Sequence, residues 1–406
     1  MKRVAIVFLM LVLGGCGAAT QSDRTIDPTV PSVASPVTTQ PAEDIRSLDS
    51  EPAVSARDAD ACSDGRITFE YPPVDLDAIE YITPLGLMTG SHVTPVDHQY
   101  YQNFKDPSRL IDVYSPAAGT ILDIQHMVEV LTDGGGEPIS DYRLVIEHTC
   151  SISSIFIHIG ELSPRIAAVA PPPGEYARVD VAVEAGEVIG SYTMNVDYNV
   201  VDLDITLEGL LVPDTYEREP WKIHTPDPFD YFAEDIRQTM IAKSLRSVEP
   251  FGGKFDHDVA GTLAGNWFEQ GTNGYGGTDQ NRYWSGHLSA AYDLFDPTHV
   301  VISIGTFDGV SLQAGVAGNA PDPRNVTVDT GLVVYELVRY DYWVDGERWD
   351  RVSLMKGIEA RNDDGSTFGV VLFELLDDTT LRVETVPGAT ADQIDGFTDA
   401  AVLYGR

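Results

Sequence analysis

The sequence is poor in basic residues, in cysteine and in long apolar runs. It contains 26 Lys and Arg against 63 Asp and Glu, for a formal net charge of -37, and only six of the basic residues are lysine. A surface this acidic repels nucleic acid and anionic lipid headgroups, so we expect no nucleic-acid partner. Cysteine occurs only at Cys16, Cys62 and Cys150. The apolar run near the N-terminus, residues 4–13, is too short to span a bilayer.

Residues 1–16 have the organisation of an export signal. A charged start, Met1-Lys2-Arg3, precedes the apolar run, and small residues then lead to Cys16. This ending resembles the bacterial lipobox, in which the cysteine is acylated and becomes the new N-terminus. The resemblance implies a lipoprotein anchored to a bacterial membrane from outside the cytoplasm, with each buried methylene contributing about 0.8 kcal/mol. The alternative is an ordinary cleaved signal peptide with an unrelated cysteine.

The segment 17–61 is dominated by Ser, Thr, Pro, Ala and Asp. Such a composition cannot bury enough apolar surface to offset the entropy of ordering, so we expect a disordered tether. The 345 residues that follow (406 minus 61) exceed one comfortable domain. Two domains are therefore expected.

Two cysteines remain once Cys16 is assigned to lipid. In an oxidising compartment two leftover cysteines usually pair, so we expect a disulfide between Cys62 and Cys150. It would join the end of the tether to the turn of a hairpin in the first domain. The alternative is two separate buried thiols.

That hairpin is the centre of the first domain. Residues 142–148 alternate with the two-residue period of a half-buried strand, and residues 154–159 resume the pattern after a polar turn. His148 and His158 therefore lie on antiparallel neighbours close to the core. The simplest interpretation of each histidine is a buried, neutral imidazole hydrogen-bonded to a backbone carbonyl.

Four motifs around this hairpin follow one another in a distinctive order. They are V-Y-S-P-A-A-G-T-I at 113–121, V-I-E-H at 145–148, F-I-H-I at 156–159 and V-E-A-G-E-V-I-G at 183–190. Together they resemble the lysostaphin-type, or LytM-like, zinc endopeptidases of bacterial cell walls, over roughly residues 82–207. The resemblance implies an antiparallel β domain, a zinc ion and cleavage of peptidoglycan cross-links or other peptides. It gives His148 no metal role, so we interpret His148 as structural.

The zinc-binding motifs of that family are altered here. The family's His-x-x-x-Asp is matched only at Asp97, with His92 five residues earlier and His98 directly after it. The family's His-x-His falls on D-L-D at 202–204, so both histidines are aspartates. Zinc accepts carboxylate and imidazole donors at about 2.0–2.2 Å. On the resemblance, the metal ligands would be Asp97, His98 and Asp204, and the catalytic positions would be His158 and Asp202.

These changes weaken the case for hydrolysis. Asp202 cannot donate a proton at neutral pH unless its pKa is strongly raised. A carboxylate at Asp204 adds negative charge, which favours harder cations and makes a metal-bound water less acidic. Three interpretations remain: a polar cluster without catalysis, an altered divalent-metal site, and a working hydrolase.

Residues 213–253 are predicted to connect the two domains and to contain one helix. Asp227 is a suitable N-cap, Pro228 suits the first turn, and acidic residues follow it. Basic residues Arg237 and Lys243 fill the C-terminal half, where they complement the helix dipole.

Residues 254–406 are predicted to be mainly β. Strand-like segments cover 300–304, 332–339, 351–356, 369–376 and 381–386, with turns at Asp345-Gly346 and Asp364-Gly365. This spacing predicts a closed barrel or a sandwich. Gly265-Asn266-Trp267 is similar to the Gly-x-Trp of lipocalin barrels, which would imply a small apolar ligand. A tryptophan at this position more often serves only to plug the core.

The sequence thus predicts a mainly β protein with a lysostaphin-like domain at 62–212, a linking helix within 213–253 and a β-barrel or sandwich at 254–406. The favoured function is binding to the cell wall or another surface polymer by a degenerate LytM-like domain anchored through Cys16. One alternative is an active metal-dependent endopeptidase. The other is ligand binding by the C-terminal barrel.

Overall fold

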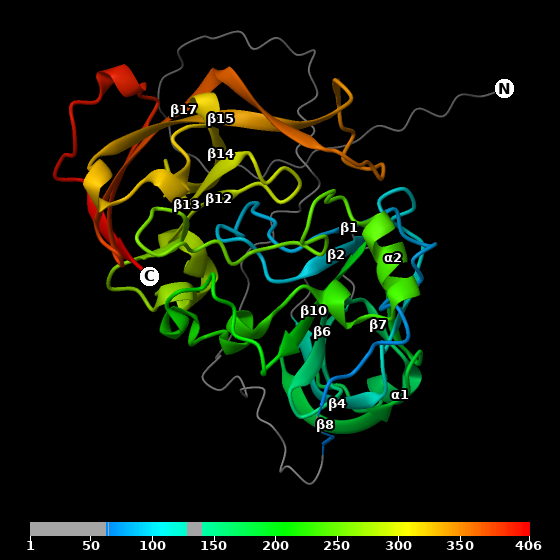
Figure 1. Ribbon diagram of the computed structural model, residues 1–406. Helices are drawn as coiled ribbons and strands as arrows, with labels where there is room; N and C mark the ends of the chain where they lie inside the picture. The colour runs from blue at the N-terminus through cyan, green and yellow to red at the C-terminus, as the bar shows by residue number, and fades with distance from the viewer. Residues whose placement is uncertain (1–61, 64, 128–139) are drawn as a thin grey trace, which may run out of the picture. The chain divides into compact units, whose positions relative to one another are not determined.

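A seven-stranded antiparallel sheet dominates the first part of the chain (Figure 1). The computed structural model describes residues 62, 63, 65–127 and 140–406. In spatial order the strands are β1 (Tyr81–Thr83), β2 (Gln99–Gln102), β10 (Asn195–Asp202), β6 (Ile152–Ile159), β5 (Asp141–Glu147), β4 (Gly119–Met127) and β8 (Tyr176–Val183).

The predicted central hairpin is confirmed as the antiparallel pair β5 and β6. Leu144, Ile146 and Phe156 point into the main core and are fully buried. Val145 and Ile155 lie opposite each other on the other face, in a smaller apolar cluster that includes Val201. Apolar side chains therefore cover both faces of the middle of the sheet, and this packing fixes the positions of β5 and β6.

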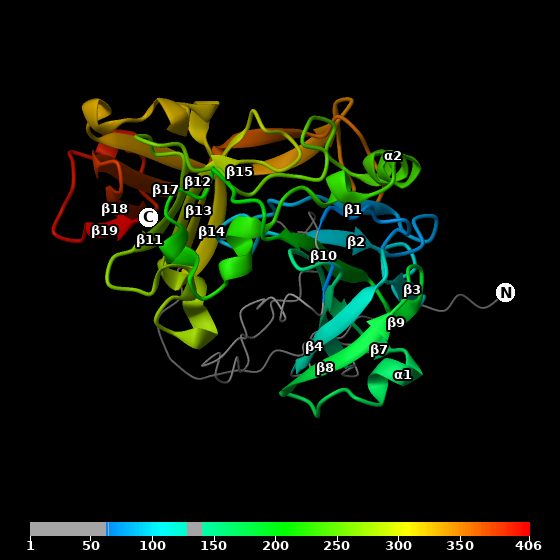
Figure 2. The ribbon, with the colours of Figure 1, turned by 60° about the horizontal axis from the view of Figure 1, so that its bottom comes forward.

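A three-stranded sheet packs against the same core. It consists of β3 (Ile111–Tyr114), β9 (Val188–Tyr192) and β7 (Glu161–Leu162), and the short helix α1 (Pro164–Ala167) follows it. Figure 2 shows this group beside β4 and β8. Buried Val113 and Ile189 join Leu144 and Phe156 in one cluster, so the two sheets share a hydrophobic core.

The connector is mostly short 3₁₀ turns, at Pro213–Tyr216, Pro220–His224 and Pro228–Tyr231, followed by α2 (Glu234–Lys243). The prediction that the helix begins at Asp227 was wrong. Asp227 caps the last 3₁₀ turn by accepting a hydrogen bond from the Phe229 N–H, and the chain is extended at Phe232. There Phe69 forms a parallel bridge to Phe232, and this pairing holds the backbone out of helical geometry until residue 234.

The C-terminal part is a closed eight-stranded antiparallel β-barrel, which confirms the predicted mainly β fold class and decides between barrel and sandwich. Its strands follow the chain in order, and β14 pairs with β15 to close it. The members are β11 (Gly265–Glu269), β12 (His287–Tyr292), β13 (Val300–Phe307), β14 (Val310–Val316), β15 (Val333–Val344), β17 (Glu359–Asp377), β18 (Thr380–Pro387) and β19 (Val402–Gly405); β16 (Glu347–Arg348) pairs with the far end of β15.

The barrel interior follows strand periodicity. Val300, Ile302 and Ile304 on β13 enter its core, whereas Val301 faces outward and packs with Met88. Trp267 is fully buried, donates its indole N–H to the Leu263 carbonyl at 2.8 Å and lies under the Arg406 guanidinium at 4.1 Å. This residue therefore packs in the barrel core and is covered by an arginine.

Two details of the barrel differ from the sequence prediction. Residues 351–356 form no strand, and Asp364-Gly365 lies inside β17 rather than in a turn. The long strand β17 continues past Asp364-Gly365, and its pairing with β15 shifts register on either side of Val338. These residues therefore form a bulge within the strand and not the expected turn.

The barrel and the seven-stranded sheet belong to one compact unit that contains every described residue. Tyr81 packs with barrel-side aromatics Tyr342 and Trp349. Lys356 donates to the carbonyls of Ile241 and Ser244 at the C-terminal end of α2. The first contact joins β1 to the barrel, and the second fixes the end of α2 against it.

Candidate functional site

His158 lies on an irregular part of β6. Tyr142 pairs with Ile159 and Leu144 with Phe156, so two residues, Ile157 and His158, face the single residue between the partners on β5. His158 also has a φ of 71°, a left-handed conformation that is uncommon for a residue other than glycine. A bulge re-aims a side chain, and strained residues of this kind concentrate at functional sites.

The bulge places the imidazole of His158 between two carboxylates. Its Nδ1 is 3.0 Å from Asp141 Oδ2, and its Nε2 is 3.5 Å from Asp197 Oδ2. Asp141 begins β5, and Asp197 on β10 lies opposite Ile157. Three neighbouring strands therefore supply these three side chains.

The loop before β2 brings a second imidazole to the same carboxylate. His98 Nε2 is 3.3 Å from Asp197 Oδ2 and 2.9 Å from the Tyr100 hydroxyl. On its other side, His98 Nδ1 is 3.4 Å from Asp97 Oδ1. The ring of His92 lies edge-on to that of His98, with 5.9 Å between centroids.

A buried lysine from the connector completes the arrangement. Lys222 Nζ is 2.8 Å from Asp97 Oδ1 and 2.9 Å from Glu219 Oε2. We call the set His92, Asp97, His98, Asp141, His158, Asp197 and Lys222 the histidine–carboxylate cluster.

The charges of the cluster depend on burial and on these pairings. Burial lowers the pKa of His92 to about 3, so this imidazole is neutral. Burial also acts to lower the pKa of His158, but the carboxylates of Asp197 and Asp141 outweigh it and raise the pKa to about 9. His158 is therefore an imidazolium at neutral pH. For Asp197 burial outweighs both imidazoles, and its pKa lies above the ordinary value.

Asp97 and Lys222 form a mutually stabilised ion pair. Burial acts to raise the pKa of Asp97, but the Lys222 ammonium and His98 hold it well below its usual range. Burial acts to lower the pKa of Lys222, but Asp97 and Glu219 raise it above the ordinary value. Both side chains therefore stay charged over the physiological range.

The expected ligand set does not come together. Asp97, His98 and His158 all lie in the histidine–carboxylate cluster, but Asp202 and Asp204 do not. On β10, Asp197 is opposite Ile157 and Asp202 is opposite Ile152. Five residues of strand span about 17 Å, so Asp202 lies far along the strand from Asp197.

The two aspartates have other partners. Asp202 accepts a hydrogen bond from the Tyr231 hydroxyl at 2.6 Å and one from the backbone N–H of Asp204. Asp204 accepts from the Ser151 hydroxyl at 2.9 Å. Asp202 and Asp204 therefore lie apart from His158, and Asp197 is the aspartate of β10 that reaches it.

The donors that are present do not fit a zinc site. Within residues 62–127 and 140–406, apart from residue 64, no three or more His, Cys, Asp or Glu side chains are grouped so that they could hold a metal ion. Asp97 is engaged by an ammonium, and each ring nitrogen of His98 faces a carboxylate or a hydroxyl. We therefore derive no step through a metal.

His148 has the structural environment expected for it. Its Nδ1 faces the Ala118 carbonyl at 3.1 Å and its Nε2 faces the Ser154 hydroxyl at 2.9 Å. Burial lowers its pKa to about 4, so the ring is neutral. At neutral pH, His148 is therefore neutral, whereas His158 carries a positive charge.

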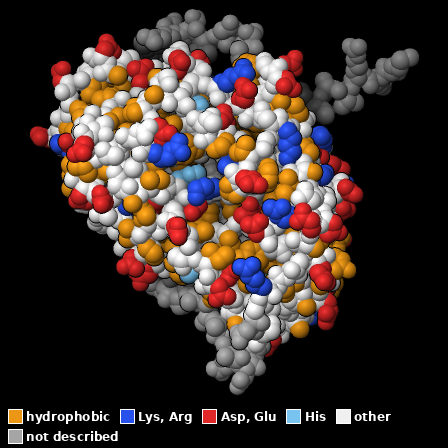
Figure 3. Space-filling view, in the orientation of Figure 1, with side chains coloured by type: hydrophobic (Ala, Val, Ile, Leu, Met, Phe, Trp, Pro, Cys, Tyr) orange, Lys and Arg blue, Asp and Glu red, His pale blue; other side chains and the backbone are white. Residues whose placement is uncertain are grey.

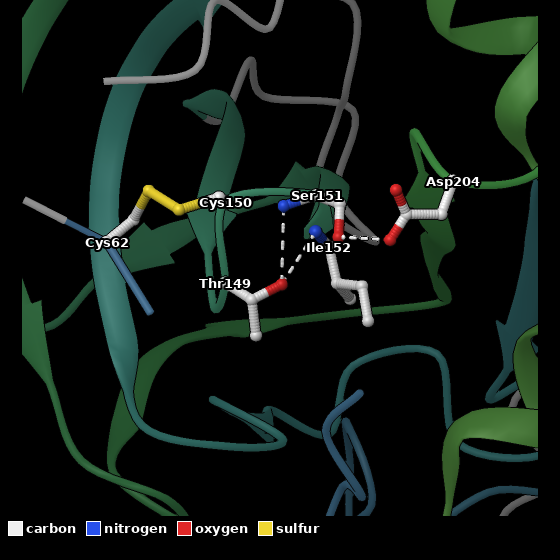
Figure 4. Close-up of a disulfide and its surroundings, with 6 residues drawn as sticks. All are labelled: Cys62, Thr149, Cys150, Ser151, Ile152 and Asp204. Atoms are coloured by element: carbon white, nitrogen blue, oxygen red, sulfur yellow. Dashed lines mark hydrogen bonds between the residues drawn. A yellow bond between two sulfur atoms is a disulfide. The ribbon is translucent and has the colours of Figure 1, made fainter. Parts of the chain in front are cut away.

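Cys62 and Cys150 are joined in a disulfide at the hairpin turn (Figure 4). Next to it, the Thr149 hydroxyl oxygen accepts hydrogen bonds from the N–H groups of Ser151 and Ile152. The disulfide thus holds the start of the described chain against the hairpin turn, close to Asp204. Cys16 and the segment 17–61 lie outside the described residues.

Acidic side chains are spread across the face of the molecule seen in Figure 3. In the part of the chain that the structure describes, no helix combines the length and apolarity needed to cross a membrane.

Comparison with known proteins gives little further information. No family model matches the sequence, and no curated protein matches it. Among solved structures, the chain is similar to one from the SpoIIQ–SpoIIIAH pore-forming complex, with 11% identity, a TM-score of 0.27, and coverage of 42% of this chain and 94% of that one.

Proposed function

We propose that this protein is an extracytoplasmic lipoprotein that binds the cell wall or a related surface polymer through a LytM-like domain without hydrolysing it. The observation that carries the proposal is the state of the histidine–carboxylate cluster. Its carboxylates and imidazoles contact one another, and the Lys222 ammonium neutralises Asp97. The lipid anchor on Cys16 and the location outside the cytoplasm belong to the same proposal.

The charge state of His158 argues against hydrolysis. A general base must be unprotonated at the working pH and able to reach the water that it activates. With a pKa of about 9, His158 is protonated at neutral pH and is held between Asp141 and Asp197. It cannot take a proton from water in this state.

Half-buried aromatic rings of the barrel segment between β11 and β12 lie beside the cluster and would extend the binding surface of the LytM-like domain. Tyr275 lies 4.5 Å from the Lys222 ammonium and 5.7 Å from the ring of Tyr283, which in turn contacts Trp284 at 5.3 Å. Ligand sites typically combine aromatic side chains with a few fixed polar groups. Sugar rings and peptide side chains of a wall polymer match such a surface.

The test is co-sedimentation of residues 17–406 with purified peptidoglycan, together with an assay for released amino groups in buffer with and without zinc. We expect saturable binding and no release of amino groups. Trp284→Ala should weaken binding by about tenfold or more, because tryptophan and tyrosine side chains contribute most of the energy of an interface.

The matched control is Trp343→Ala, which removes another half-buried tryptophan, covered by Arg361. It should bind as the unmodified chain does. Zinc-dependent release of amino groups would make the protein a peptidase instead. Absence of binding would refute the wall-binding role.

A further inference from the structure

The seven-stranded sheet ends at β8, which pairs with β4 (Figure 1). Ile124 on β4 and Leu144 on β5 pair with each other and are fully buried in the main core. The next residue on β4 and the preceding one on β5, Gln125 and Arg143, point to the opposite side of the sheet. Three strands therefore form a second face at this edge. We call its two rows of cross-strand neighbours the outer face: Val145, Asp123 and Arg178, then Arg143, Gln125 and Tyr176.

The first row contains a carboxylate oxygen without a hydrogen-bond donor. Arg178 Nε is 3.5 Å from Asp123 Oδ1, but this buried oxygen accepts no hydrogen bond from any residue that the structure describes. The Asp123 side chain is only 17% exposed, and burial raises its pKa above the ordinary value against the effect of Arg178 and Arg143. A buried acceptor without a donor is costly, so Asp123 favours a ligand that supplies one.

The second row lies between two aromatic rings. Tyr176 stands at the open end and is 51% exposed. At the other end the Arg143 guanidinium lies over the Trp221 ring at 5.2 Å, and Trp221 packs against Val145 on the same side of the sheet. Neighbouring strands are about 4.8 Å apart, so the row from Arg143 to Tyr176 extends about 10 Å, close to the length of a disaccharide.

The outer face concentrates positive charge in an acidic chain. Arg143, Arg178 and Asp123 together carry one positive charge, whereas the whole chain has a net charge of -37. At physiological ionic strength, exposed charges more than about 8 Å away are largely screened, so the nearby guanidiniums outweigh distant carboxylates. The planar guanidinium matches a carboxylate with two parallel hydrogen bonds. This face is therefore complementary to a ligand that carries carboxylates.

We propose that the outer face binds an acidic sugar chain, whose carboxylates pair with Arg143 and Arg178 and whose hydroxyl groups donate to Asp123. Sugar rings would pack on Tyr176, in the usual combination of an aromatic ring with a few fixed polar groups. An acidic peptide has carboxylates but few hydroxyl donors, so the unpaired oxygen of Asp123 favours the sugar.

This inference rests on the proposed function and names the chemistry of the polymer that the LytM-like domain contacts. The outer face continues from the histidine–carboxylate cluster, because Trp221 directly precedes Lys222 in the connector. One polymer could therefore contact both.

The test is isothermal titration calorimetry of residues 17–406 with tetragalacturonate and with its methyl ester, in which the same sugar rings carry no charge. We expect saturable binding of tetragalacturonate, binding of the ester at least about tenfold weaker, and a Kd that rises as sodium chloride increases from about 0.1 M to about 1 M. This comparison needs no variant. Absence of binding, or equal binding of the ester, would overturn the proposal.

Three variants locate the binding. Arg178→Gln, at a side chain that is 49% exposed, should weaken tetragalacturonate binding about tenfold or more. Asp180→Asn removes a negative charge two residues further along β8, on the same side, and should tighten binding. The matched control is Arg382→Gln on the barrel, where the arginine is 39% exposed and lies 3.8 Å from Glu374; it should bind as the unmodified chain does. Equal effects of Arg178→Gln and Arg382→Gln, or weaker binding by Asp180→Asn, would contradict the proposal.

Two further results separate this inference from the proposed function. Poly-glutamate that binds as tightly as tetragalacturonate would assign the outer face to acidic peptides and overturn the sugar. Peptidoglycan that co-sediments with the protein while tetragalacturonate fails to bind would overturn this inference alone. Tetragalacturonate binding without co-sedimentation would refute the wall-binding role and support the sugar site.

Discussion

The charged state of His158 gives a stability that depends on pH in a definite direction. The imidazole has a pKa of about 9 in the folded protein, raised from 6.5 by Asp197 and Asp141 against the effect of burial. A raised pKa means that the folded state binds the proton more tightly than the unfolded state. The stabilisation is therefore fully present below about pH 6.5 and is lost as the pH rises through about 9.

The size of the effect follows from the shift. A difference of about 2.5 pKa units at about 1.4 kcal/mol per unit corresponds to about 3 kcal/mol of unfolding free energy. The side chain of His158 is 17% exposed and that of Asp141 is 0% exposed, so solvent screening removes little of this. We expect His158→Gln to abolish this part of the pH dependence.

The assay is urea unfolding at pH 6.5 and pH 9.5 for the unmodified protein, for His158→Gln and for His148→Gln as the matched control. The unmodified protein and the control should lose about 3 kcal/mol more than His158→Gln over this interval. His148 has a pKa of about 4 and is neutral in the folded protein at both pH values, so its removal changes the difference only through the unfolded state, by about 0.4 kcal/mol. An imidazole of His158 that titrates at or below pH 6.5 by NMR would refute the reasoning.

Three further predictions concern the region around the disulfide and the far end of β10. Replacing Cys62 and Cys150 by serine should lower the unfolding free energy by about 4–5 kcal/mol, since the bond closes a loop with a sequence separation of 88; equal urea midpoints would contradict this. Tyr231→Phe should cost about 1–3 kcal/mol in the same assay, because the buried carboxylate of Asp202 loses its 2.6 Å donor. Asp204→Ala should change stability by less than about 0.5 kcal/mol and should leave peptidoglycan binding intact, since the Asp204 side chain makes an exposed hydrogen bond to Ser151 outside the histidine–carboxylate cluster; loss of binding would show that Asp204 takes part in binding.

The parts of the fold that depend on local periodicity were predictable from the sequence. The alternation at 142–148 and 154–159 predicted the hairpin β5–β6, and the strand spacing beyond residue 254 predicted a barrel or sandwich. The position of His158 on the second strand of that hairpin followed as well. Its bulge did not, because a register shift of one residue leaves no clear trace in a run of apolar residues.

The candidate site was only partly predictable for a geometric reason. Asp197 and Asp202 are both buried on β10, and alternation alone cannot say which one meets His158. Being five residues apart, Asp197 and Asp202 face opposite sides of the sheet, so only one of them can meet His158.

Lys222 could not have been found from local sequence. It lies 125 residues from Asp97, and the two meet only because the connector folds back against the sheet. Its one sequence signal is scarcity: a lysine in a chain with few of them, next to Trp221 and close to Glu219. Contacts over such separations depend on the whole fold rather than on any pattern near the residue.

The most direct test of the account is a crystal structure of the protein grown in zinc, with diffraction data collected on both sides of the zinc absorption edge. The account predicts the Lys222 ammonium within hydrogen-bonding distance of Asp97 and no anomalous peak among Asp97, His98 and His158. A zinc peak bound by these side chains, with Lys222 displaced, would contradict the account and favour a metal-dependent hydrolase.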